Sequence, residues 1–122
     1  ARGGNKSKGY TYAGSNTIDS VAWYNDNSNN TAHPIMQKQA NELGLYDMTG
    51  NVCEWCSDWY LDFYYSESTN SKDPKGPSAG TFRLYRGGSW YSLAKYCRVA
   101  LRTYNGPGGY YSWLGFRIVL PQ

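Results

Sequence analysis

The chain has 122 residues, a length that fits one domain with a single hydrophobic core. Aromatic residues make up 17% of it and glycine accounts for 14 residues, a composition that disfavours a helical bundle and favours short strands, turns and long ordered loops. The net charge of +3 comes without a Lys/Arg cluster, so nucleic-acid binding is not indicated, and no apolar run approaches the ~20 residues of a membrane span.

The first half of the chain predicts little regular structure. Residues 1–16, rich in Gly, Lys, Ser and Tyr, predict an extended loop. Residues 18–24 predict a short strand or a turn of helix, and residues 25–30, made of Asn, Asp and Ser, predict a polar loop. After a turn at residues 49–51, residues 52–60 alternate with a period of two, which predicts a strand.

The second half predicts one long polar loop and three more strands. The loop covers residues 66–80, where an Asp-Pro-Lys-Gly-Pro run predicts turns. The strands are predicted at residues 82–85, 97–102 and 116–120.

Two arginines fall on one face of the strand that begins at Cys97. Alternation places Arg98 and Arg102 together there, and buried charge without a partner is costly. Glu54 and Asp58 share a face of the earlier strand, so we predict Arg–carboxylate pairs with a structural role. Losing either partner should destabilise the fold strongly. A role in ligand binding is the alternative.

The chain has three cysteines, an odd number that argues against a disulfide framework. Cys53 and Cys56 have the spacing of a redox or metal half-site, but a structural zinc site would need both Cys97 and His33 to complete it. Buried reduced thiols are the simpler interpretation. We expect His33 to be a surface or turn residue.

The segment 86–117 has the composition of a binding surface. Tyr and Trp give a large contact area at low entropy cost, and Ser, Gly and Asn adapt their hydrogen bonding. We therefore predict a recognition module, because few groups in the chain could carry acid–base chemistry. The candidate ligand-binding residues are Tyr91, Ser92, Leu93, Tyr96, Leu101, Thr103, Tyr104, Asn105, Gly108, Gly109, Tyr110, Tyr111, Ser112 and Trp113. The six aromatic ones are the expected anchors.

Two blocks of sequence resemble the formylglycine-generating enzyme (sulfatase-modifying factor) family. The first covers residues 44–60, with Gly-Asn-Val-Cys-Glu-Trp at its centre, and the second begins with the Arg-Gly-Gly-Ser-Trp run at 86–90 and ends with Gly-Phe-Arg at 115–117. The resemblance implies a single α+β domain over residues 1–122, with a C-type lectin-like fold of short antiparallel strands, few helices and long ordered loops. Residues 1–4 resemble the middle of that domain, so we expect the chain to be its C-terminal portion.

The enzyme branch of this family binds copper(I) through two late cysteines and oxidises a substrate cysteine with oxygen. The motif match puts Ser92 at the first of these positions and Cys97 at the second. A hydroxyl does not replace a thiolate as a ligand of copper(I). The resemblance therefore disfavours an oxidase, and a sulfatase-modifying enzyme or a degenerate relative is the alternative.

The fold is also similar to the variable proteins of diversity-generating retroelements. Their C-terminal segment is rewritten at adenines in the coding template, so that Asn codons of the AAC type become NNC codons. Such codons never specify Trp, Lys, Met, Gln or Glu, and every candidate ligand-binding residue except Trp113 belongs to the permitted set.

This second resemblance implies a protein without enzymatic activity that displays a diversified, tyrosine-rich surface in residues 86–117. The implied ligand is a macromolecule, a bacterial surface protein or glycan, met on a phage virion or a cell surface. A structural domain of the same fold without diversification is the remaining alternative.

The family resemblance also implies a candidate calcium site at Asp47, Gly50, Val52 and Glu54. Calcium takes about six to eight hard oxygen ligands, which two carboxylates and backbone carbonyls would begin to supply. The competing interpretation pairs Glu54 with an arginine and binds no metal. Both stay open, and no other cofactor is expected.

Overall fold

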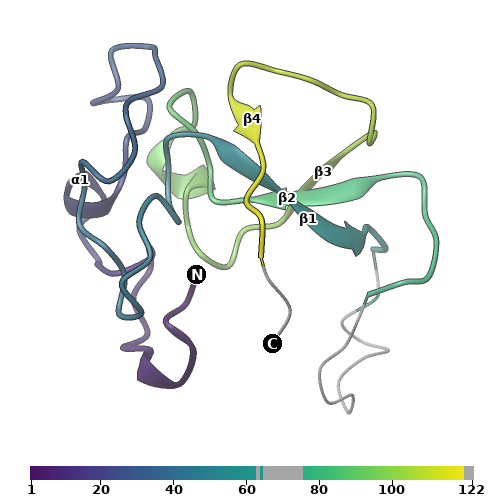
Figure 1. Ribbon diagram of the computed structural model, residues 1–122, viewed down its shortest axis with the longest axis horizontal. Coiled ribbons are helices and arrows are strands. Elements are labelled where there is room, and N and C mark those ends of the chain that lie inside the picture. The colour runs from purple at the N-terminus through teal and green to yellow at the C-terminus, as the bar shows by residue number, and fades with distance from the viewer. Residues whose placement is uncertain (63, 65–75, 120–122) are drawn as a thin grey trace.

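Short strands and short helices are joined by long irregular segments in this structure (Figure 1). The computed structural model describes residues 1–62, 64 and 76–119. In chain order the elements are η1 (Gly4–Lys6), α1 (Ile18–Val21), β1 (Cys53–Trp59), β2 (Arg83–Arg86), η2 (Ala94–Tyr96), β3 (Thr103–Asn105) and β4 (Leu114–Gly115). The predicted α+β architecture with few helices and long loops is confirmed. Within the described ranges no helix is long and apolar enough to cross a bilayer.

The four strands form one sheet in the order β3-β2-β1-β4. β1 and β2 are antiparallel, as are β2 and β3. β4 joins the other edge of the sheet parallel to β1, so the sheet is mixed and not purely antiparallel. β3 and β4 lie at opposite edges of the sheet, and the chain between them makes a long arc beyond it (Figure 1).

The strands predicted at 52–60 and 82–85 are confirmed as β1 and β2. The strand predicted at 97–102 is wrong. η2 ends just before it, and a turn with a hydrogen bond from Leu101 N to Arg98 O (3.0 Å) bends the chain, so that pairing begins only at Thr103.

The last strand lies earlier than predicted. The sequence favoured residues 116–120, but β4 consists of Leu114 and Gly115, because Cys53 and Glu54 pair with these two residues. Residues 116–119 continue without strand pairing. Residue 120 and the part of the predicted polar loop between 66 and 75 lie outside the described residues.

The core lies beside the sheet, between α1 and η2. The turn of helix predicted within 18–24 is confirmed as α1. Val21, Ala22, Tyr24 and Cys97 form the buried cluster, and Tyr12, Ile18 and Ala94 pack against it. The core is thus built from segments far apart in sequence.

The turn at Gly50 and Asn51 joins three parts of the chain. Gly50 N donates to Gly87 O (2.8 Å), Asn51 N to Trp23 O (2.7 Å), and Trp90 N to Asn51 O (2.7 Å). Gly50 has φ +74°, and a Cβ there would lie 2.3 Å from Trp23 O, so only glycine fits. This turn positions the segment 87–90 and therefore the start of the candidate surface.

Candidate functional site

A pocket of about 560 Å³ opens beside the sheet, and we call it the aromatic pocket. Half of the candidate ligand-binding residues line it: Tyr91, Ser92, Leu93, Tyr96, Leu101, Thr103 and Trp113. They come from the segment around η2, from β3 and from the residue before β4. The fold therefore brings together side chains that the sequence spreads over more than twenty residues.

Register across the sheet explains why part of the pocket wall is aromatic. Tyr85 is the partner of Trp55 on one side and of Thr103 on the other, and cross-strand partners share a face. Trp55 and Tyr85 make an edge contact with ring centroids 5.8 Å apart, and Tyr85 lies 5.7 Å from Trp113. These rings make a continuous aromatic row from β1 to the residue before β4.

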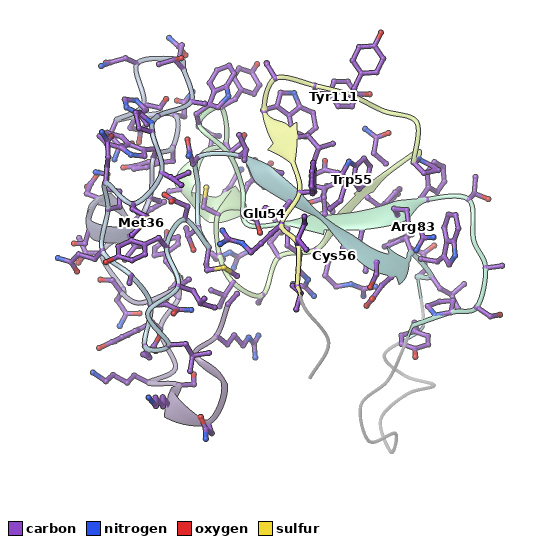
Figure 2. All side chains as sticks on the ribbon, viewed as in Figure 1. Met36, Glu54, Trp55, Cys56, Arg83 and Tyr111 are labelled. Atoms are coloured by element: carbon purple, nitrogen blue, oxygen red, sulfur yellow. The ribbon has the colours of Figure 1, made fainter. Side chains whose placement is uncertain are left out.

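The loop between β3 and β4 extends this surface. Tyr111 stacks on Trp113, with centroids 4.7 Å apart and an interplanar angle of 10°, and its hydroxyl accepts a hydrogen bond from Asn105 Nδ2 (3.3 Å). Tyr110 is 92% exposed. Gly109 N donates to the carbonyl of Gly106 (3.0 Å), which turns the loop. Figure 2 shows Tyr111 on this loop, beyond the end of the sheet that carries β4.

The opposite rim is formed by residues 89–93. Ser89 N donates to Ser92 Oγ (3.0 Å), which closes a tight turn, and Tyr91 at its tip is 64% exposed. Trp90 Nε1 donates to the carbonyl of Ser112 (3.3 Å), so the two rims are joined across the pocket mouth. The rims are thus held in place while their outer side chains face solvent.

Tyr104 is separated from the other candidates. It lies between Thr103 and Asn105 on β3, and alternation turns it to the face that carries Leu84, its partner on β2. There its ring stacks on Tyr60 (3.8 Å) and contacts Phe82 (5.3 Å). Tyr104 is 45% exposed, but its ring contacts lie on the face of the sheet away from the aromatic pocket.

Three pocket residues lie outside the predicted binding segment 86–117: Asn25, Cys53 and Tyr85. The period-two pattern of the first two strands could have pointed to Cys53 and Tyr85, because it fixes which side chains share a face. Asn25 is held beside the pocket by a hydrogen bond from its backbone N to the carbonyl oxygen of Ser92 (3.0 Å). No local sequence signal reports a contact across so many residues.

Cys53 and Cys97 are free thiols buried close to the pocket, as predicted, while the free thiol of Cys56 is half-buried. Burial, and then the neighbouring Cys97, raise the pKa of Cys53 to about 12. Burial raises the pKa of Cys97 to about 11. Both groups are therefore neutral thiols at ordinary pH, and neither is an activated nucleophile.

The match to a copper(I) pair does not fit this geometry. Ser92, at the first ligand position, has its hydroxyl engaged with Ser89 N and Ser89 Oγ. Cys97, at the second, is fully buried, and its thiol donates to Leu93 O (3.7 Å). One buried thiol and one hydroxyl are a poor donor set for a soft monovalent metal.

The predicted arginine–carboxylate pairs need a correction. Glu54 pairs with Arg117, whose Nη2 lies 2.7 Å from Glu54 Oε1 and whose Nε reaches both carboxylate oxygens at 3.1 and 3.0 Å. This hydrogen bonding raises the pKa of Arg117. The pairing follows from register, because Glu54 is the partner of Gly115 on β4 and Arg117 comes two residues later.

Arg98, Arg102 and Asp58, the other residues of the predicted pairs, have different contacts, because residues 97–102 are not a strand. Arg98 is exposed, and its Nε donates to Lys95 O (2.9 Å). The guanidinium of Arg102 lies over the ring of Tyr60, 5.5 Å from its centroid. Asp58 accepts a hydrogen bond from Ser57 Oγ (3.3 Å).

The proposed calcium ligands do not fit a cation. Both carboxylate oxygens of Glu54 accept hydrogen bonds from the guanidinium of Arg117, which supplies the positive charge there. Glu54 is labelled in Figure 2. Asp47 Oδ2 accepts the backbone N–H of Met36 (2.9 Å). Among the described residues, no three His, Cys, Asp or Glu side chains are grouped so as to hold a metal ion.

His33 lies in a loop, as predicted, but it is half-buried. Its ring stacks on Trp23 at 3.8 Å, and its Nε2 donates to Ser28 O (2.7 Å). Its backbone N–H donates to Asn51 Oδ1 (2.9 Å). The residue therefore fixes this loop, away from the aromatic pocket.

Comparison with known proteins identifies the family. The chain matches the sulfatase-modifying factor enzyme 1-like domain over residues 1–121. It is 51% identical over 85 residues to serine/threonine-protein kinase pkn1 of Chlamydia caviae, covering 69% of this chain and 14% of that protein. It is 45% identical over 87 residues to the formylglycine-generating enzyme of Streptomyces coelicolor, covering 69% of this chain and 27% of that protein.

Among solved structures, the chain is similar to variable protein 1 of Treponema denticola, with a TM-score of 0.83 and 40% identity. That match covers 95% of this chain and 41% of the other. The chain thus spans less than half the length of each of these relatives. The family and the fold expected from the Gly-Asn-Val-Cys-Glu-Trp and Arg-Gly-Gly-Ser-Trp blocks are confirmed: the chain belongs to the sulfatase-modifying factor enzyme 1-like domain family.

Proposed function

We propose that this domain binds a macromolecular ligand through the aromatic pocket and the rims beside it. The observation that carries the proposal is that candidate residues from the segment around η2, from β3 and from the position before β4 line one pocket, with Tyr91 exposed beside it and Tyr110 exposed on the loop between β3 and β4. Exposed aromatic rings around a concave apolar site are typical of binding surfaces. The similarity to variable protein 1 of Treponema denticola supports the same conclusion.

The lining of the pocket favours a ligand recognised by shape and apolar contact. Among the residues that the structure describes, Arg86 is the one charged residue lining the pocket, and Arg86 Nη1 already donates to Val99 O (3.3 Å) and Leu101 O (2.9 Å). Uncharged recognition by Tyr and Trp suits an exposed loop of a protein or the faces of sugar rings. We therefore propose a bacterial surface protein or glycan as the ligand, met on a cell surface or a phage virion, and diversification of residues 86–117 as the source of specificity.

A binding experiment tests the role of the rims. The labelled domain is applied to a panel of intact bacterial cells and to an array of purified glycans. A variant with Tyr91→Ser, Tyr110→Ser and Tyr111→Ser should lose at least about tenfold in affinity for any target of the wild type, because exposed aromatic anchors carry most interface energy. Leu45→Ser, an exposed apolar residue outside the segment, is the control and should bind as the wild type does. Equal binding by the triple variant would contradict the proposal.

A genetic observation tests diversification separately. The coding segment for residues 86–117 is sequenced from many isolates of the gene. Substitutions should concentrate at the rim positions, while the scaffold positions Cys97 and Gly115 and the block 44–60 stay constant. Substitutions spread evenly over both segments would remove diversification from the proposal and leave a fixed binding site.

The second candidate function is cysteine oxidation of the formylglycine-generating type, favoured by the 45% identity to such an enzyme. Ser92 and the buried Cys97 argue against it. The domain is mixed with one equivalent of copper(I) and a cysteine-containing peptide, and oxygen uptake is followed. We expect uptake no faster than in a blank without protein. Protein-dependent oxygen consumption would establish the enzymatic alternative.

A further inference from the structure

A second pocket, of about 270 Å³, lies between the N-terminal segment and the turn that follows η2. We call it the arginine pocket, because Arg2 and Arg98 both line it, together with the hydroxyl residues Ser7, Tyr10 and Thr11. It shares no lining residue with the aromatic pocket. Nothing in the proposed function uses it, so it calls for a separate explanation.

The charge of the arginine pocket is one-sided. None of its lining residues is acidic, and neither Arg2 nor Arg98 has an acidic partner among the residues that the structure describes. Glu42, on the neighbouring loop, accepts the backbone N–H of Lys8 (3.1 Å). Two guanidinium groups therefore line one small pocket.

The two walls of the pocket are fixed to each other. Val99 N donates to Thr11 O (3.0 Å), and Thr11 N donates to Asn16 Oδ1 (2.9 Å). The hydrogen bond from Arg98 Nε to Lys95 O holds the stem of that side chain and leaves its two Nη groups for a ligand. The fold thus brings together two arginines that lie far apart in the sequence.

One side of the pocket is open at the backbone. Gly9 has φ +73°, and no atom lies within 4 Å of the position that a Cβ would take. A ligand can therefore approach the main chain there without meeting a side chain. A volume of 270 Å³ equals about nine water molecules in the liquid, more than an oxyanion alone needs.

We propose that the arginine pocket binds a sugar that carries a phosphate or sulfate ester. The planar guanidinium donors of Arg2 and Arg98 match the oxygens of a tetrahedral oxyanion. The hydroxyls of Ser7, Tyr10 and Thr11 suit the hydroxyl groups of a sugar ring. The remaining volume accommodates that ring. This site is independent of the aromatic pocket and stands whether or not the proposed function does.

Isothermal titration calorimetry and amide NMR shifts test the proposal with defined probes. Glucose 6-phosphate and glucose 6-sulfate distinguish the two esters, glucose lacks the oxyanion, and inorganic phosphate lacks the sugar. We expect at least one ester to bind and to shift the amide signals of Gly9 and Thr11. Glucose should not bind, and inorganic phosphate should bind at least about threefold more weakly than the ester, because the hydroxyl contacts are missing.

Arg98→Gln should weaken ester binding about tenfold, because a charge-assisted pair of hydrogen bonds is lost. Lys6→Gln removes the same charge from an exposed residue outside the pocket and should change affinity less than twofold. Arg2→Gln serves as the second variant if Arg98→Gln does not fold. The proposal is overturned if neither ester binds the wild type, if a folded arginine variant binds as tightly as the wild type, or if glucose or inorganic phosphate binds as tightly as the esters.

Discussion

Adjacent residues of β3 point to opposite faces of the sheet and have different surroundings. Thr103 lines the aromatic pocket, whereas Tyr104 packs against Tyr60 and Phe82 on the other side. The tyrosines of the loop beyond β3 differ again, since Tyr110 projects almost entirely into solvent. Tyrosine thus packs against other rings at position 104 and is exposed for recognition at position 110. On β3, the strand register decides which face of the sheet a side chain occupies. The comparison predicts that substitutions on the two faces have separate effects.

The largest effect is expected at Leu84, which is buried on the packing face and lies opposite Tyr104. Leu84→Ala should lower the free energy of unfolding by about 3 kcal/mol, since it removes buried methyl groups and leaves a cavity. Urea denaturation measures the change. Leu93→Ala, on the exposed rim of the pocket, is the matched control and should cost less than about 1 kcal/mol. Equal losses would break the division between the faces.

Alkaline pH should destabilise the fold through the buried thiols. The folded-state pKa of Cys53 is about 12, above its ordinary value of 9.0, so its contribution is complete below pH 9 and is lost as the pH rises towards 12. Between pH 9 and about pH 11 this loss amounts to about 2 kcal/mol. Urea denaturation at several pH values gives the free energy of unfolding as a function of pH. Above pH 9 this free energy should fall less steeply with pH for Cys53→Ala than for the wild type. Identical slopes would mean that this thiol is not protected by burial.

The smallest effects on stability are expected at two tyrosines, Tyr104 and Tyr110. Tyr104→Ala should lower the free energy of unfolding by about 1–2 kcal/mol, because a stacked ring is lost. Tyr110→Ala should change it by less than about 0.5 kcal/mol, because the side chain has few contacts to lose. Thermal melts report both changes. A destabilised Tyr110→Ala protein with an unaffected Tyr104→Ala protein would reverse the assignment of the two faces.

The parts of the fold that depend on local pattern could be predicted from the sequence. Alternation located β1, the strand signal at residues 82–85 located β2, and the long specific motifs identified the family and its short-strand architecture. The stretch 97–102 also alternates, yet it forms a turn. Alternation predicts which residues would share a face if a strand formed, but pairing with a neighbour decides whether one does, and β2 finds its partner at Thr103.

The composition of the segment predicted half of the residues that line the aromatic pocket, but it did not show which side chains lie on which face of the sheet. Tyr91, Tyr96 and Trp113 meet at one pocket, as expected of a binding surface. Tyr104 satisfies the same compositional and codon criteria but lies outside the pocket, because the register of β3 against β2 turns its side chain to the other face. Likewise, the partner of Glu54 could not be chosen correctly before the parallel pairing of β1 with β4 was known.

Several candidate positions support the framework through their carbonyl oxygens. Trp90 Nε1 donates to Ser112 O, Asn25 N to Ser92 O, and Arg86 Nη1 to Leu101 O. Every amino acid supplies the same carbonyl, so replacing the side chain at position 112 or 101 leaves these bonds available. A surface supported in this way can accept new side chains at these positions while its backbone framework stays the same.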